Sequence, residues 1–359
     1  MPVASQRYYY AHYRYHFISN FVPAYMNRFV NSIGRIVEQF TPFRATLIKT
    51  STLAKMSSLK PTMSVNTENT SMSTERTTPS VSEIPKIAAY RAVSQPSSVA
   101  ALEAAEKPTP VVEPLQIKVN DSRGGFVPAY LHMSPEHDST APPSTAAILL
   151  SGAGGGVVGP SGIYLSMATK LAALSATVPT LRLDYRFPAR DAACCEDVLA
   201  AMEYLGTAFG ITRFVLIGWS FGGAPVFTVG GEDQRVVGCA TVASQTAGTE
   251  GIRSLAPRPV LLLHGLEDST LSPRCSEQLY DMYGPDGDRE IKFFEGDNHA
   301  LTTSSALAEE LLIGFVVKCA GTGMSKSEQE MAAKEIIASE EKVTIMKQGG
   351  DLRGNESVE

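Results

Sequence analysis

The sequence predicts an α/β fold, a mostly parallel sheet of about eight strands with helices on both faces. From residue 113 to 320, short apolar segments rich in Val, Ile and Leu alternate with longer segments of helical apolar spacing. A strand pair precedes this alternation, and the repeated strand–helix units that follow need crossover connections, which make successive strands parallel. About 205 residues are enough for one sizeable core, so we expect one domain.

The elements can be assigned in chain order. Two alternating segments, Leu115 to Val119 and Phe126 to His132, flank a turn rich in Asp, Ser and Gly and should form the strand pair. The further strands are expected at 146–150, 180–184, 213–217, 236–242, 259–263 and 290–294, and the helices at 162–174, 191–207, 221–229, 273–283 and 303–319. Only 16 residues separate Val242 from Pro259, too few for a helical cap. We therefore expect no cap domain and an open site.

The N-terminal segment, residues 1–112, differs from this core in composition. Ser, Thr, Pro and Ala dominate from Lys49 to Pro110, without glycine, which predicts disorder. The first 60 residues carry eight Lys or Arg and one acid, Glu38, which is compatible with a mitochondrial transit peptide, although five early tyrosines are unusual for one. A targeting segment, a disordered extension and a later start of translation, at Met56 or Met63, remain open.

Residues 321–359 form a charged C-terminal tail. Its segment from Glu328 to Met346 could be helical. Met331, Ile336 and Ile337 could pack on the core or on a partner, but we expect a solvated helix that frays.

Composition also narrows the compartment and the partners. The five cysteines include no C-x-x-C pair and fit neither a disulfide framework nor a zinc site, which favours a reducing compartment (Cys194, Cys195, Cys239, Cys275 and Cys319). No secretory signal and no run of about 18 apolar residues is found, so we expect no membrane span. The net charge is −6 overall and −13 beyond residue 60, which argues against nucleic-acid binding. We expect an intracellular protein, cytoplasmic or alternatively mitochondrial.

One segment of the core indicates a chemistry. Gly218 to Gly222 spell G-x-S-x-G around Ser220, directly after the apolar strand at 213–217. In a turn this tight, small residues two before and two after the serine let the strand and the helix approach each other without a clash. The Ser220 hydroxyl would then stand at a helix N-terminus, where the dipole favours negative charge. The alternative is a glycine turn without catalytic use.

A nucleophilic serine needs a base and a carboxylate that orients the base. Asp268 follows the strand at 259–263 in the segment H-G-L-E-D, and His299 follows the strand at 290–294 in E-G-D-N-H. His299 is the one histidine of six that lies after Asp268 in the chain. Asp268 could instead be a turn or cap residue and His299 a surface histidine. Glu267 and Asp297 are rival acids, which we expect to be solvated turn residues.

These segments together resemble the α/β-hydrolases, in which the serine, the acid and the histidine follow in this chain order. The resemblance covers residues 113–320 and looks closest to small lidless serine hydrolases of the dienelactone-hydrolase-like and thioesterase-like kind. It implies Ser220 as nucleophile, Asp268 as acid and His299 as base. The loop from Ser151 to Gly156 resembles the family's H-G-x-G-G loop, with Ser151 in place of histidine. By this resemblance the backbone N–H groups of Ala153 and Phe221 would form the oxyanion hole.

We therefore expect a serine hydrolase that cleaves an ester or thioester of a small-molecule acyl substrate through an acyl-enzyme, with no cofactor and no metal. An acyltransferase, a cyclase or a C–C hydrolase with the same triad remains open, as does a non-catalytic binding protein of this fold. Gly154, Gly156 and Gly159, with Asp184 downstream, also match a dinucleotide-binding pattern. That alternative gives no role to the ordered serine, acid and histidine. The sequence indicates neither the substrate nor the oligomeric state.

Overall fold

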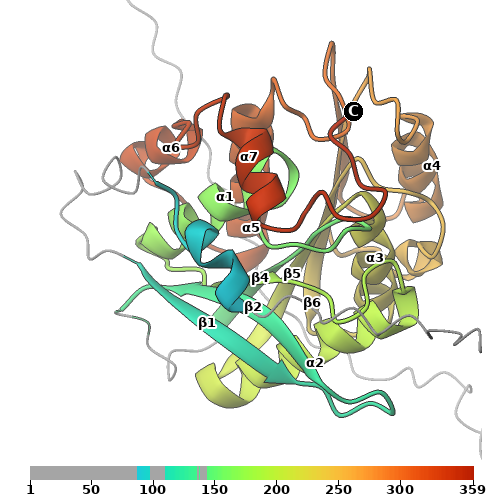
Figure 1. Cartoon of the computed structure of the whole chain (residues 1–359). Helices are drawn as coiled ribbons and strands as arrows, with labels where there is room; N and C mark the ends of the chain where they lie inside the picture. The colour runs from blue at the N-terminus through green and yellow to red at the C-terminus, as the bar shows by residue number, and fades with distance from the viewer. Residues whose placement is uncertain (1–86, 98–109, 136, 138–143) are drawn as a thin grey trace, which may run out of the picture. The chain divides into compact units, whose positions relative to one another are not determined.

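One sheet organises the residues described by this computed structural model, which are 87–97, 110–135, 137 and 144–359 (Figure 1). Within them, eight strands lie in the order β1-β2-β4-β3-β5-β6-β7-β8. Strand β2 is antiparallel to β1 and β4, and every other neighbouring pair is parallel. The strands are β1 (Val111–Lys118), β2 (Phe126–Met133), β3 (Ser144–Leu150), β4 (Thr180–Leu183), β5 (Ile211–Trp219), β6 (Val236–Val242), β7 (Val260–Gly265) and β8 (Arg289–Phe294). The predicted mostly parallel α/β sheet is confirmed.

Helices cover both faces of this sheet. On one face lie α1 (Ile163–Ala173) and α5 (Ser305–Ala320), and on the other α2 (Asp191–Phe209), α3 (Gly223–Glu232) and α4 (Arg274–Tyr283). Alternate residues of β3 explain the two layers, because Ala147 and Leu149 enter one apolar cluster and Ala146 and Ile148 the other. A strand buried on both faces reads as a continuous apolar run, which is the pattern that predicted the core strands. The arrangement is the α/β-hydrolase fold.

The connection between β6 and β7 holds only the short 3₁₀ helix η5 (Glu250–Ser254). The prediction that no cap domain is inserted there is confirmed. None of the helices in the described ranges is long and apolar enough to cross a membrane.

The C-terminal tail packs on the core, so the expectation of a solvated helix is wrong. It forms two helices, α6 (Lys326–Ala333) and α7 (Lys342–Gln348), and buries Ile336, Ile337 and Met346 in the same cluster as α1 and α5. Ile336 and Ile337 are adjacent, and a continuous helix would turn their side chains about 100° apart. A break between α6 and α7 lets both reach the core.

The predicted N-terminal extension lies mostly outside the described residues, which omit 1–86 and 98–109. Its described part forms the 3₁₀ helix η1 (Ile87–Val93). Tyr90 and Val93 are buried there, and the Tyr90 hydroxyl donates a hydrogen bond of 2.7 Å to Asp184. Disorder is therefore a wrong prediction for residues 87–97. Two well-spaced apolar side chains suffice to anchor a segment too short to show a helical period.

Candidate functional site

Ser220 lies at the tight turn where β5 ends and the 3₁₀ helix η4 (Ser220–Gly222) leads into α3. Its φ of 55° is a left-handed conformation that side chains other than glycine rarely adopt. A Cβ on Gly218 would overlap the backbone of Gly222, and a Cβ on Gly222 would lie 2.5 Å from the Leu150 carbonyl oxygen. Both glycines are thus required by close backbone approach. The turn has the tightness and the strain that the G-x-S-x-G pattern predicted.

Asp268 and His299 are brought together from two loops at the carboxyl edge of the sheet. Asp268 follows β7 and His299 follows β8, and these strands are parallel neighbours. His299 Nδ1 lies 2.7 Å from Asp268 Oδ2, and both side chains are buried. A Cβ on Gly265 would overlap the Asp297 carbonyl oxygen, so this glycine lets the two loops approach. The predicted acid and the predicted base are hydrogen-bonded.

Four donors converge on the Asp268 carboxylate. Besides His299, His264 Nε2 lies 3.0 Å from Oδ2, while the backbone N–H groups of Thr270 and Leu271 donate to Oδ1 at 2.8 Å each. Burial alone would raise the pKa of Asp268, but the hydrogen bonds from His264, His299 and the backbone outweigh it and hold this pKa well below its usual range. Asp268 is therefore an anion at neutral pH.

His264 is a partner of the acid that sequence reasoning did not identify. Its Nε2 lies 3.0 Å from the Leu271 carbonyl oxygen as well as from Asp268, so Nε2 carries the proton. Its Nδ1 then accepts from the Ser276 hydroxyl at 2.7 Å. The spacing of four residues between His264 and Asp268, across a turn at a strand end, was the available signal.

The two rival acids, Glu267 and Asp297, do not take the position beside His299 Nδ1 that Asp268 has. Glu267 is exposed. Asp297 is buried, contrary to the expectation of a solvated residue, and accepts hydrogen bonds from the backbone N–H groups of Thr303 and Ser304 before α5. Those bonds satisfy backbone donors near a helix start. Of the three carboxylates, Asp268 is the one that is hydrogen-bonded to His299 Nδ1 in the described part of the chain.

Trp219, next to the serine, holds the histidine loop. Its indole N–H donates to the His299 carbonyl oxygen at 3.0 Å, and the two rings lie 5.5 Å apart. The indole is fully buried. Trp219 therefore packs against the loop that carries His299.

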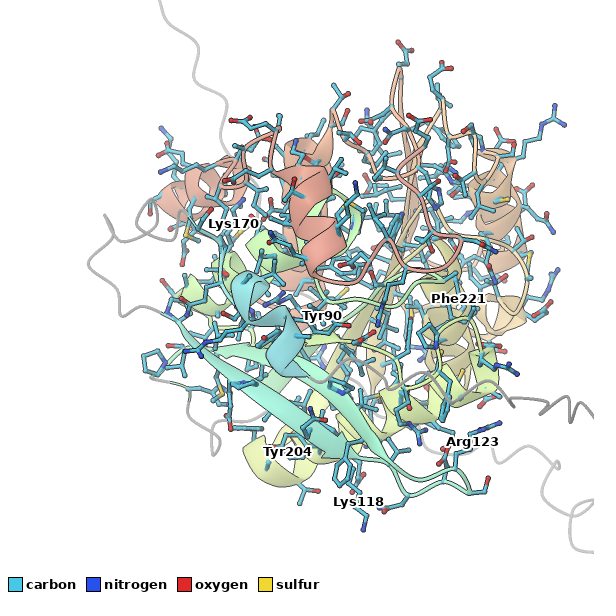
Figure 2. All side chains as sticks on the ribbon, in the orientation of Figure 1. Tyr90, Lys118, Arg123, Lys170, Tyr204 and Phe221 are labelled. Atoms are coloured by element: carbon cyan, nitrogen blue, oxygen red, sulfur yellow. The ribbon has the colours of Figure 1, made fainter. Side chains whose placement is uncertain are left out.

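The predicted oxyanion donors lie at two loops that meet beside Ser220. Ala153 is in the glycine loop, residues 151–156, directly after β3. Phe221, labelled in Figure 2, directly follows the serine at the start of η4. The Gly222 position is within reach of the carbonyl oxygens of Leu150 and Ser151, so the glycine loop and the turn that carries Ser220 are in contact. The Ala153 N–H donates to the carboxylate of Glu356.

Glu356, from the C-terminal tail, also reaches the predicted base. Its Oε1 lies 3.2 Å from His299 Nε2, the nitrogen that does not face Asp268. Within the described residues, no hydrogen bond joins Ser220 to His299. Ser220 is 5% exposed and His299 is fully buried. The expectation of an open site is wrong, because the cover comes from the C-terminus and not from an insertion between strands.

Burial lowers the pKa of His299, but its hydrogen bonds with Asp268 and Glu356 and their two negative charges outweigh burial and raise this pKa above its ordinary value. The imidazolium is thus favoured between two carboxylates. Nothing in the sequence of the tail marked Glu356 as a contact of the site.

The glycines of the loop after β3 are accounted for without a nucleotide. Gly156 N–H donates to Asp184 Oδ1 at 2.8 Å, and the N–H groups of Val158 and Gly159 donate to Asp351. Asp184 also binds Arg353 at 2.7 Å. The groups that a dinucleotide would need are therefore paired within the chain. Among the described residues, no cluster of three or more His, Cys, Asp or Glu could hold a metal ion.

Neither a protein-family model nor a curated protein matches this chain. Solved structures resemble it, among them Est1E from Butyrivibrio proteoclasticus, at 16% identity and a TM-score of 0.46, covering 60% of this chain and all of that one. Dienelactone hydrolase from Anabaena variabilis has 15% identity and a TM-score of 0.46 and covers 56% and 97%. XC6422 from Xanthomonas campestris, described as an α/β serine hydrolase without lid, has 12% identity and a TM-score of 0.44 and covers 59% and 96%.

Proposed function

We propose that the chain is a serine hydrolase that cleaves a carboxylic ester or thioester through an acyl-enzyme. The observation that carries the proposal is the buried His299–Asp268 pair, 2.7 Å apart, at the same sheet edge as a serine held at a φ of 55°. A turn residue or a surface histidine would need neither this burial nor this partner. Strain of this kind is characteristic of functional sites.

Each side chain then has a role in the reaction. Ser220 attacks the acyl carbon while His299 Nε2 accepts its proton and later donates it to the leaving group. Asp268 accepts from Nδ1–H, which fixes the tautomer with Nε2 free to act as base, and it stabilises the imidazolium. Water then attacks the acyl-enzyme by the same proton route and releases the acid. No cofactor enters these steps.

Backbone donors stabilise the oxyanion of both tetrahedral intermediates in this proposal. The N–H groups of Ala153 and Phe221 are the candidates, and the bond from Ala153 to a carboxylate oxygen supports its capacity to bind negative charge. Loss of one such donor typically costs about 10²–10³-fold in rate.

The test is covalent labelling with a fluorophosphonate, which reacts only with an activated serine. We expect the wild type to gain the probe's mass on the peptide that contains Ser220. Ser220→Ala and His299→Ala should not be labelled, whereas Ser254→Ala, which removes an exposed hydroxyl in η5, should react like the wild type. A Ser220→Ala protein that is still labelled, or still turns over every substrate of the wild type, would exclude Ser220 as the nucleophile.

Product analysis separates the reactions that share this triad. Mass spectrometry of the products from a panel of esters and thioesters distinguishes a free acid from a transferred acyl group, a ring or a cleaved C–C bond. A folded protein that binds acyl compounds but neither reacts with the probe nor turns over any of them would be a binding protein of this fold.

A further inference from the structure

The last residues of the chain, 349–359, lie along the candidate site, and we name them the C-terminal segment. In Figure 1 this segment leaves α7 and crosses toward the loops near α4, where the terminus is marked. Backbone bonds hold it at both ends, from Val157 N to the Gly349 carbonyl at 3.1 Å and from Ala300 N to the Val358 carbonyl at 3.3 Å. The segment therefore spans from the glycine loop to the loop that carries His299.

Glu356 belongs to this segment and contacts two groups that the proposed reaction uses, the Ala153 N–H and His299 Nε2. One carboxylate oxygen accepts from the Ala153 N–H, and the other lies 3.2 Å from His299 Nε2. The Glu356 side chain is buried although it belongs to a chain terminus. A carboxylic acid product would place its oxygens in the same way, one at an oxyanion donor and one at the base. Glu356 thus has the position of a bound acid product.

The glycine loop is shaped for this occupant. A Cβ on Gly152 would overlap the Glu356 carboxylate, and a Cβ on Gly154 would lie 2.6 Å from the Arg353 carbonyl oxygen. A Cβ on Gly156 would lie 2.5 Å from Asp351. Three glycines therefore leave room for the same segment, which indicates that the loop and the segment fit each other along their length.

Two further residues of the segment, Asp351 and Arg353, anchor it. Asp351 is fully buried and accepts from the Ser151 hydroxyl and from the N–H groups of Val158 and Gly159. Arg353 Nη2 donates to Asp184 Oδ1 at 2.7 Å. Ser151 stands where the resembling family has histidine, and here its hydroxyl serves the segment.

We propose that the site binds an acidic peptide, the chain's own residues 349–359, and that this segment inhibits the enzyme in cis. The inference rests on the proposed function. While Glu356 is in place, His299 Nε2 faces a carboxylate in place of the Ser220 hydroxyl, and the Ala153 N–H is unavailable to an oxyanion. Substrate and segment compete for the same two groups, so activity requires the segment to leave.

Point variants of the full chain test this. Glu356→Ala removes both contacts, and Glu356→Gln keeps the shape and one acceptor oxygen, so its effect should be smaller. Glu359→Ala is the matched control, because it removes an equal charge from an exposed side chain of the same segment. Arg353→Ala releases the segment from a point that touches no catalytic group.

Two readouts are needed, and one of them does not depend on catalysis. Hydrogen–deuterium exchange of peptides covering 151–159 and 349–359 reports whether the segment is bound. The rate of fluorophosphonate labelling of Ser220 reports whether the site is accessible. We expect Glu356→Ala to speed exchange in both peptides and to raise the labelling rate about 10- to 100-fold, the effect of losing a charge-assisted hydrogen bond. Arg353→Ala should act in the same direction and Glu359→Ala should match the wild type. A synthetic peptide of residues 349–359, added to Glu356→Ala, should slow labelling again.

The outcomes separate the two proposals. Equal labelling rates for wild type, Glu356→Ala and Arg353→Ala would overturn inhibition and leave the hydrolase in place. Slower labelling of Glu356→Ala would also overturn it and make Glu356 a part of the catalytic machinery. Faster exchange without labelling of any variant would retain the bound segment but refute the activated serine, and inhibition with it.

Discussion

Asp268→Asn is the substitution that tests the geometry of the site most directly. The Asp268 carboxylate accepts four hydrogen bonds, two from ring nitrogens at 2.7 and 3.0 Å and two from backbone N–H groups at 2.8 Å. An asparagine has the same shape but only one acceptor oxygen. Whichever way it turns, its NH₂ group must face two of these donors. No orientation satisfies all four partners.

The larger consequence concerns the tautomer of His299. If the asparagine oxygen stays with the backbone donors, the NH₂ group faces both histidines. His264 Nε2 must keep its proton because the Leu271 carbonyl also accepts from it. His299 must then accept at Nδ1 and carry its proton on Nε2, where it cannot take the Ser220 proton. A substitution of this kind in a serine protease costs about 10⁴-fold in rate, or about 5.5 kcal/mol of activation free energy. Unpaired buried donors add about 1–3 kcal/mol of lost folding stability.

The labelling rate of Ser220 measures the first effect and urea unfolding the second. Glu267→Gln is the control, since it makes the same chemical change one residue earlier on an exposed side chain and should alter neither quantity. If the C-terminal segment slows the wild type too much, both substitutions are compared in Glu356→Ala. If Asp268→Asn reacts within about tenfold of its parent, Asp268 does not set the tautomer of His299.

Two further predictions follow from pH and from packing. His299 Nδ1–H donates to Asp268, which His264 also contacts, so only the imidazolium can donate from Nε2 to Glu356 as well. Because the pKa of His299 is raised, the stability from these contacts is fully present below its unfolded value of about 6.5 and is lost as the pH rises through the folded pKa. The labelling rate should rise with pH with a midpoint above about 6.5, and Glu356→Ala should lower that midpoint; identical pH profiles would contradict this. Gly222→Ala places a Cβ 2.5 Å from the Leu150 carbonyl oxygen and should reduce the unfolding free energy by about 1–3 kcal/mol. Gly314→Ala, within α5 with nothing in contact range, should raise it by about 0.5–1 kcal/mol, and two equal shifts in urea unfolding would refute the packing argument.

The core was predictable because its signals are local. Each central strand is buried on both faces, so an apolar run such as Pro259 to Leu263 can be recognised without knowledge of its neighbours. Bounds differ from the prediction by one to three residues at most helix ends, as expected where a cap and not a pattern ends the helix. The order of strands in space follows from crossover rules only in part. Placing β4 between β2 and β3 needs the structure.

The predicted acid and base were found together because their positions depend on strand ends, which the sequence marks. His264 was missed as a partner of Asp268. Its contacts with Asp268 and Leu271 depend on the path of the turn, which the sequence pattern does not give. Tyr90 and Val93 were missed because a single turn with two apolar residues has no period to detect. Both failures concern contacts between residues whose proximity no local pattern encodes.

The contact of the C-terminal segment with His299 was also not predictable from a local sequence pattern, and it changes the access to the candidate site. The absence of an insertion between β6 and β7 excludes a cover from that connection, and the prediction of an open site extended this to the whole chain. The Ala153 N–H and His299 can both bind a carboxylate. Glu356 supplies this carboxylate, although it lies 57 residues after His299 in the chain. Its neighbours Asp351 and Arg353 fix the path that brings it there. A domain of this fold without an inserted cap therefore need not be uncovered, because residues 349–359 fit against the loop after β3 and contact the buried His299.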